Sequence, residues 1–160
     1  MASRQSDLKA ARLGFSGASL ILGCDFVTTA SEKTMELGRS DKTVAIVNVH
    51  EQMTGDFARD KNSQFPRDKL KDTIRRRLGD GNVDFVEATR IATSLMGNSI
   101  ASNMFMLGYA YQKGLLPLGH EAINKAIEMN GASVDMNKTA FVWGRRASVD
   151  LPAVELSLIH

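Results

Sequence analysis

Apolar and polar positions divide the chain into an N-terminal half of short apolar runs and a C-terminal half with helical periodicity. Residues 19–24 and 43–49 are apolar at nearly every position, and the second run is rich in β-branched side chains. Runs of this length bounded by glycine and polar residues are typical of parallel strands buried on both faces. Together with the shorter run 83–86, they predict three strands.

Helical segments separate these strands. Asp25 stands where an N-cap residue is expected, before a helix over residues 26–37, and another helix covers residues 88–96. Alternation of strand and helix predicts right-handed crossovers and a three-layer α/β/α fold around a mostly parallel sheet. Three strands are few for a sheet covered on both faces, so the sheet is truncated or completed by strands from elsewhere.

Residues 50–65 show no period and are predicted to form a long surface loop, a class that is more often functional than idle. Pro66 follows, at the first turn of a helix that ends at Leu78. Its inner stripe is predicted to be Leu70, Ile74 and Leu78.

The C-terminal half predicts three further helices. Residues 99–113 are apolar almost all round, so this helix should be buried on most sides. Gly108 in its middle costs about 1 kcal/mol relative to alanine, which indicates close approach of another backbone. The next helix covers residues 120–130, and Ser133 is expected to cap a last helix over residues 134–146. The predicted inner positions of these two helices are Ile123, Ala126, Ile127, Asn130, Met136, Ala140 and Phe141.

This pattern predicts three segments. Residues 1–17 form a loose N-terminal segment, residues 18–147 form the α/β domain with its helical C-terminal part, and residues 148–160 form a linker or an extension that needs a partner.

Composition excludes several functional classes. Apolar content of 43%, charged content of 24% and a net charge of +2 are ordinary for a globular protein and give no nucleic-acid footprint. No apolar run approaches the roughly 20 residues that span a bilayer, and no signal-peptide core is present. Cys24 is the only cysteine, so the chain cannot form a disulfide, a zinc site or an iron–sulfur cluster by itself. A cytoplasmic location is expected.

Polar side chains follow two predicted strands. Asp25 and the pair Asn48 and His50 lie at the carboxyl ends of these strands, where ligands bind in open α/β sheets. The simpler interpretation, which we favour here, makes Asp25 an N-cap and His50 a loop histidine. No carboxylate or cysteine is set beside His50 as a catalytic triad requires, so no catalytic residue is predicted. Cys24 is expected to be a buried small hydrophobic residue.

Two asparagines and two basic clusters complete the candidates. Asn98 and Asn103 are hydrogen-bond donors for a cofactor edge or a neighbouring domain, or else an N-cap and a partner for buried backbone. The run from Arg75 to Arg77 is an anion patch or, as we favour, a complement to the helix dipole. The remaining candidates are Trp143, Arg145 and Arg146. They are either anchors of an interface or a core tryptophan beside two solvent-exposed arginines.

Several pieces of the chain carry a family resemblance. They are, in order, LILGCD, VNVHEQMTGDF, VDFVEATRIATSLMGNSIASN, GNSIASNMFMLGYAYQKGLLPL, AINKAIEMNG and MNKTAFVWGRR. Together they resemble the gamma domain of 2-oxoacid:ferredoxin oxidoreductases over residues 18–147, most closely the fused indolepyruvate type. The combination is more specific than any one piece.

The resemblance implies an enzyme that decarboxylates a 2-oxoacid to an acyl-CoA and passes electrons to ferredoxin. Such an enzyme uses thiamine diphosphate, coenzyme A and iron–sulfur clusters, with the thiamine diphosphate held by other domains. This chain would then bind no cofactor alone and would pack against the thiamine-binding and ferredoxin-type domains. The family's opening strand and GxGGxG loop have no counterpart in residues 13–17, so the chain resembles the later part of the domain.

Two alternatives stay open. The chain could be a free-standing small-molecule-binding α/β module that uses the strand ends near Asp25 and His50. It could also be a structural module that forms homo-oligomers through residues 100–111 or the Trp143 region.

Overall fold

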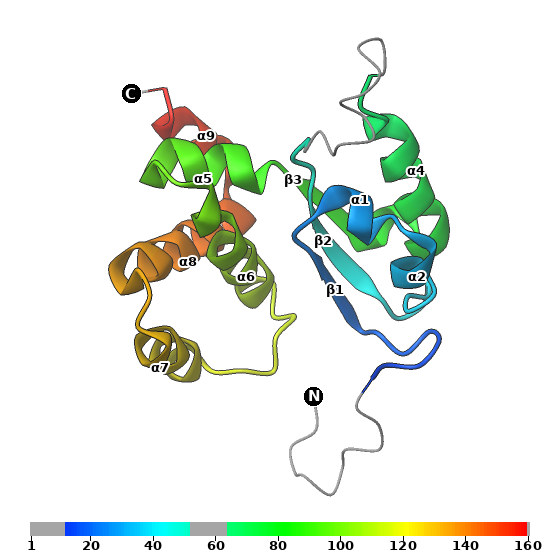
Figure 1. Ribbon diagram of the computed structural model, residues 1–160, viewed down its shortest axis with the longest axis horizontal. Helices are drawn as coiled ribbons and strands as arrows, with labels where there is room; N and C mark the ends of the chain where they lie inside the picture. The colour runs from blue at the N-terminus through cyan, green and yellow to red at the C-terminus, as the bar shows by residue number, and fades with distance from the viewer. Residues whose placement is uncertain (1–11, 52–63, 160) are drawn as a thin grey trace, which may run out of the picture.

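The computed structural model describes residues 12–51 and 64–159, in which a parallel sheet is flanked by helices (Figure 1). Strands β1 (Leu20–Gly23), β2 (Val44–Asn48) and β3 (Val83–Val86) pair in the order β1-β2-β3. The first two strands are one residue shorter at each end than the sequence predicted, and the third agrees with its prediction. Because all three strands run the same way, their carboxyl ends meet at one edge.

One face of the sheet is covered by helices from the first half of the chain. These are α1 (Phe26–Thr29), α2 (Glu32–Met35) and α4 (Arg67–Leu78). The buried side chains that fill this layer alternate with those of the other face along each strand, and they include Ile21, Phe26, Ala45, Val47, Ile74 and Leu78. Leu70 is half-buried at its border, so the predicted inner stripe of α4 is confirmed with a weaker first position.

The opposite face carries the helical C-terminal part. Helices α5 (Ala88–Met96), α6 (Ser102–Gln112) and α8 (Val134–Val149) form this layer, and a 3₁₀ turn, Ser99–Ala101, leads into α6. Its core includes Ile46, Val86, Ile91, Phe105, Met106 and Ala140. The predicted three-layer α/β/α arrangement with a helical C-terminal part is therefore confirmed.

Two glycines allow α6 and α8 to pack backbone against backbone. A Cβ atom on Gly108 would overlap the carbonyl oxygen of Phe141, and one on Gly144 would overlap the carbonyl oxygen of Phe105. The expectation from Gly108 is confirmed, and Gly144 is its counterpart on the facing helix. These glycines set the separation of the two helices, and both phenylalanines are fully buried beside them.

The predicted helix over residues 26–37 is wrong in one respect, because it is broken at Ser31. The Ser31 hydroxyl donates to the carbonyl of Thr28 at 2.7 Å, and the Thr34 hydroxyl donates to the same oxygen at 2.9 Å. Side chains that take up backbone groups in this way compete with helix continuation. Ser31 therefore caps α2 as a separate helix.

Helix α7 (His120–Asn130) packs through a narrower stripe than predicted. Ile123 and Ile127 are buried, whereas Ala126 and Asn130 are exposed. Ser133 precedes α8, but it adopts a left-handed conformation (φ 45°) and its side chain makes no cap hydrogen bond. The predicted Ser133 cap is therefore wrong.

The tail after Arg146 is helical, although the sequence indicated a linker or an unpartnered extension. Helix α8 continues to Val149, and α9 (Leu151–Ser157) follows after Asp150, whose carboxylate accepts from the amide of Ala153 at 3.0 Å. Val154 is 3% exposed and belongs to the same core as α5 and α6. The division into segments at residues 17 and 147 stays a prediction.

No helix within residues 12–51 and 64–159 combines the length and the apolar character needed to cross a membrane. Most of the predicted surface loop and of the loose N-terminal segment, residues 52–63 and 1–11, lies outside the described residues.

Candidate functional site

The carboxyl edge of the sheet carries a polar cavity of about 260 Å³. Four sequence candidates line it, namely Asp25, Asn48, His50 and Asn103, together with Cys24, Phe26, Thr89, Ser99, Ile100 and Ser102. Asp25 follows β1, Asn48 ends β2, and Asn103 lies in the first turn of α6. The topology thus brings Asp25, Asn48 and His50 to one edge, where the strand-end argument had placed them, and adds Asn103 from α6.

Asn48 is the buried centre of this edge. Its side-chain amide donates to the Cys24 carbonyl at 3.3 Å and to the Thr89 hydroxyl at 2.8 Å, and its carbonyl accepts from the Thr89 amide at 3.4 Å. The residue is 3% exposed. Asn48 therefore ties the ends of β1 and β2 to the first turn of α5, and its hydrogen-bonding groups are committed within the protein.

The other candidates at this edge differ in whether their side chains already form hydrogen bonds within the protein. The Asp25 carboxylate accepts from the Thr28 amide at 2.6 Å, which confirms the predicted N-cap. His50 and Asn103 are exposed at the cavity wall. Asn98 does not line the cavity, and its side chain accepts from the Ile100 amide at 2.9 Å as an N-cap. His50, Asn103 and Ser99 are thus the exposed polar residues in the lining of this cavity.

Cys24 is exposed, which corrects the expectation of a buried residue. Its side chain lines the cavity rather than the core because the strand ends at Gly23. Loss of water on its protein side raises the pKa of the Cys24 thiol. The neutral thiol therefore dominates at neutral pH, and a nucleophilic role is not favoured.

An ionic network that the sequence analysis did not identify borders the same edge. Arg67 donates to Glu51 at 2.8 Å and to Glu87 at 3.0 Å, and Arg90 donates to Glu87 and to Glu155 at 2.6 Å each. Hydrogen bonds from Arg90 and Arg67 lower the pKa of Glu87. The network links the end of β2 to α4, α5 and α9.

This network also lines an adjoining cavity of about 530 Å³ that shares His50 and Thr89 with the first. The only feature of the sequence that could have indicated this ionic network was the position of Glu87, directly after a predicted strand. Its partners come from distant segments, so their pairing has no local pattern.

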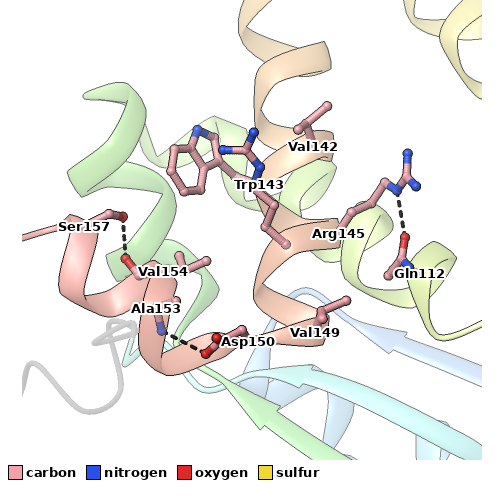
Figure 2. Close-up of a pocket in the computed structure, with 10 residues that line it drawn as sticks. Gln112, Val142, Trp143, Arg145, Val149, Asp150, Ala153, Val154 and Ser157 are labelled. Carbon is pink, nitrogen blue, oxygen red and sulfur yellow. Dashed lines mark hydrogen bonds between the residues drawn. The ribbon is translucent and has the colours of Figure 1, made fainter.

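A third cavity, of about 610 Å³, lies between α8 and α9 (Figure 2). It is lined by the three predicted interface residues, Trp143, Arg145 and Arg146. The Arg146 guanidinium lies 5.0 Å from the centre of the Trp143 ring, and Arg145 donates to the Gln112 side chain at 2.9 Å. Trp143 is half-buried in the cavity wall, so it is neither a core residue nor a fully exposed one.

The arginines at the end of α4 are partly used within the protein. Arg75 pairs with Asp80 at 2.9 Å and stacks on Phe85, and Arg77 donates to the Met35 carbonyl at 2.9 Å. They lie in the last turn of α4, where positive charge complements the helix dipole. This arrangement favours the structural interpretation over an anion patch.

Comparison with known proteins gives one match. The family model described as pyruvate ferredoxin/flavodoxin oxidoreductase matches residues 10–147. No curated protein and no solved structure matches the chain.

Proposed function

Because the chain belongs to the pyruvate ferredoxin/flavodoxin oxidoreductase family, we propose that it serves as the gamma-type packing and assembly domain of an indolepyruvate-type enzyme. The family makes it part of a 2-oxoacid:ferredoxin oxidoreductase. The indolepyruvate assignment is supported by the resemblance of residues 97–146, and the single cysteine supports a cytoplasmic location.

Enzymes of this family use thiamine diphosphate, coenzyme A and iron–sulfur clusters, with ferredoxin as electron acceptor. The described residues do not fit a complete thiamine diphosphate site. The 260 Å³ cavity at the sheet edge has no lysine or arginine in its lining to meet a diphosphate, and Asp25 adds negative charge. The arginines of the adjoining cavity, Arg67 and Arg90, are already paired with glutamates. No group of three described His, Cys, Asp or Glu side chains could hold a metal ion. We therefore assign the cofactor chemistry to neighbouring domains.

The observation that carries the assembly role is the set of exposed apolar side chains on α8, α9 and the residues after them. Val149 is 74% exposed and Leu156 is 63% exposed, and Val142 and Ile159 also face solvent. Large exposed apolar patches are rare on monomeric proteins, and where they occur they often mark an interaction surface. A second place for assembly is the outer edge of β1, which pairs only with β2 among the described strands.

Size-exclusion chromatography with light scattering tests this proposal. The chain is measured alone and after mixing with the thiamine-binding domains encoded in the same genome. A stoichiometric complex is expected because exposed apolar surface is removed from water on assembly. A monodisperse monomer that ignores those domains contradicts the proposal.

The sheet-edge cavity favours a second function, a small polar ligand bound by this chain. His50 and Asn103 face the same cavity as Asp25, and Asn48 holds its floor rigid. In the assembled enzyme, Asn103 would then contribute hydrogen bonds to the edge of a bound cofactor or substrate, whereas Asn98 caps the 3₁₀ turn and lies outside the cavity. Isothermal titration of the isolated chain with 2-oxoacids tests this function, since binding lost in Asn103→Ala but kept in Asn98→Ala would assign it to the cavity.

A further inference from the structure

The groove between α8 and α9 is formed by two helix faces that meet at Asp150. On α8 the groove is lined by Trp143 and by a set at positions 142, 145, 146 and 149, and on α9 and its cap by a set at positions 150, 153, 154 and 157. Both sets have the spacing i, i+3, i+4 and i+7, which places each set on one face of a helix. Figure 2 shows the two faces bordering a common hollow, with Trp143 at its wall. The stripe on α8 alone is about 10 Å long.

The surface of this groove is largely apolar at its base. Val142 is 40% exposed and Val149 is 74% exposed, and the aromatic ring of Trp143 forms part of the wall. Tryptophan and arginine are the side chains enriched among residues that dominate binding energy at protein interfaces. The groove therefore has an apolar stripe that a partner can cover.

The rim of the groove carries positive charge without an internal counter-charge. Neither Arg145 nor Arg146 forms an ion pair with any residue in the described ranges, in contrast to Arg67 and Arg90. The one acidic residue in the lining, Asp150, uses its carboxylate to cap α9. A complementary partner would bring carboxylates to the two guanidiniums.

From this combination we propose that the α8–α9 groove binds an acidic amphipathic helix of a neighbouring domain of the same oxidoreductase. The inference rests on the proposed assembly function and names the partner chemistry at one surface. An amphipathic helix presents an apolar stripe at the same i, i+3, i+4, i+7 spacing, so it matches the groove in pattern. Glutamates beside that stripe would meet Arg145 and Arg146 in charge-assisted hydrogen bonds.

The chain supplies its own reporter for a test, since Trp143 is its only tryptophan. The probes are three synthetic peptides that share one leucine stripe, lack tryptophan and carry glutamate, glutamine or lysine beside the stripe. Trp143 emission and the anisotropy of labelled peptide are measured with the full chain. The glutamate peptide is expected to bind saturably, and about tenfold more tightly than the lysine peptide. Equal affinity for the three peptides, or no saturable binding, would overturn the proposal.

Matched variants locate the binding. Val149→Ser and the double change Arg145→Gln with Arg146→Gln are each expected to weaken the glutamate peptide about tenfold, and the double change also reduces the salt dependence. Met129→Ser is the control, since Met129 is a 77% exposed apolar residue on α7, outside the groove. Circular dichroism confirms that each variant is folded. Equal losses in Met129→Ser and Val149→Ser would refute a site in the groove.

The same variants separate this inference from the proposed function. If the wild-type chain joins the thiamine-binding domains and Val149→Ser joins them equally well, assembly stands and the groove proposal fails. If the wild-type chain does not join them but binds the glutamate peptide through the groove, the peptide chemistry is supported and the assembly function fails. Light scattering of the chain with peptide also detects self-association, and a dimer that excludes the peptide would overturn the inference in favour of a second copy.

Discussion

Asn48 shows how one buried amide fixes the edge where the candidate site lies. Its replacement by alanine would leave the Cys24 carbonyl and the Thr89 hydroxyl without their partner in a buried place. We expect Asn48→Ala to lower the free energy of unfolding by about 2 kcal/mol, measured by urea denaturation. Asn103→Ala is the control. Asn103 is exposed at the same cavity, so its replacement should change stability by less than about 0.5 kcal/mol.

At Gly108 and Gly144 the absence of a side chain is itself the structural feature. Alanine at either position would gain about 1 kcal/mol in helix propensity, yet its Cβ would overlap a backbone carbonyl of the facing helix. Because backbone cannot move aside as a flexible side chain can, each change should lower the stability by about 3 kcal/mol. Gly81→Ala serves as the control, since a Cβ there meets nothing within 4 Å. Wild-type stability of Gly108→Ala in urea would contradict the close packing of α6 and α8.

These residues also show what local pattern could and could not predict. Gly108 was identifiable because a glycine inside an apolar helix has a cost that needs a compensating contact. Gly144 lies beside Trp143 and two arginines, so it does not stand out as a glycine inside an apolar helix. Its close approach to the Phe105 carbonyl was therefore seen only once α6 and α8 were paired. The strand-end argument placed Asp25, Asn48 and His50 at one edge, but it did not predict that Asn103 of α6 lines the same cavity, and the exposure of Cys24 depends on where β1 ends. A role in binding for any of these residues stays a prediction.

At the scale of elements, α9 packs against the helical C-terminal part through one buried side chain. Val154 packs into the core shared by α5, α6 and α8. Val154→Ala should therefore lower the stability by about 2 kcal/mol, from lost burial and the cavity left behind. Leu156→Ala, at a 63% exposed position of the same helix, is expected to be nearly neutral. Equal and negligible effects of both changes in urea denaturation would restore the linker interpretation.

The ionic network joins four elements and gives the fold a pH dependence of definite sign. Arg90 and Arg67 hold the pKa of Glu87 below its ordinary value of 4.5. A carboxyl group with a lowered folded-state pKa stabilises the fold above the unfolded-state pKa, and this contribution is lost as pH falls through the folded-state value. Glu87→Gln should thus destabilise the chain at pH 7 by at most about 1 kcal/mol, since the side chains are partly exposed.

The difference between wild type and Glu87→Gln should shrink below about pH 4.5, and also in 1 M salt, where the screening length falls to about 3 Å. Thermal unfolding across this range of pH and salt measures both effects. Glu121→Gln is the control, because Glu121 forms no ion pair with the described residues. A constant difference at all pH values would show that Glu87 acts by packing alone.

Sequence patterns predicted the positions of most helices and strands, but they did not predict the break at Ser31 or helix α9. Apolar patterns located β1, β2, β3, α4, α5, α6 and α7 to within a few residues, since each element buries either one stripe or, as in β2 and α6, most of its surface. The break at Ser31 depends on hydroxyl groups of Ser31 and Thr34 that compete for one carbonyl, which a period cannot reveal. Helix α9 is too short for a clear stripe, and its burial depends on the core formed by α5 and α6.

For the whole molecule, the α8–α9 groove and the carboxyl edge of the sheet are two separate surfaces, and the groove is the more apolar of the two. The α8–α9 groove carries exposed apolar side chains and arginines that form no ion pair with the described residues, which favour a protein partner. The carboxyl edge of the sheet is mainly polar apart from Ile100, and Asn48 and Asp25 use their side chains within the protein. This separation favours a domain that is held by its helical end and that presents the sheet edge to a neighbour.

That separation predicts how the isolated chain responds to thiamine diphosphate. We expect no measurable heat of binding for thiamine diphosphate with Mg²⁺, because the sheet-edge cavity offers no cation to the diphosphate and its 260 Å³ is below the usual size of cofactor pockets, about 300–1,000 Å³. Isothermal titration of the chain, of the thiamine-binding domains and of their complex measures this directly. The thiamine-binding domains and the complex should both bind thiamine diphosphate, whereas the chain alone should not.

A second test of the same prediction measures the enzymatic activity of the complex. Electron transfer from a 2-oxoacid to ferredoxin should need the thiamine-binding domains together with this chain, and Val149→Ser should lower the activity by weakening assembly, with the loss recovered at higher concentration of the variant chain. Recovery with concentration distinguishes an assembly defect from a catalytic one, because mass action restores the complex. Tight binding of thiamine diphosphate by the isolated chain would instead require a diphosphate site within it, and the division of labour argued from the cavity lining would be wrong.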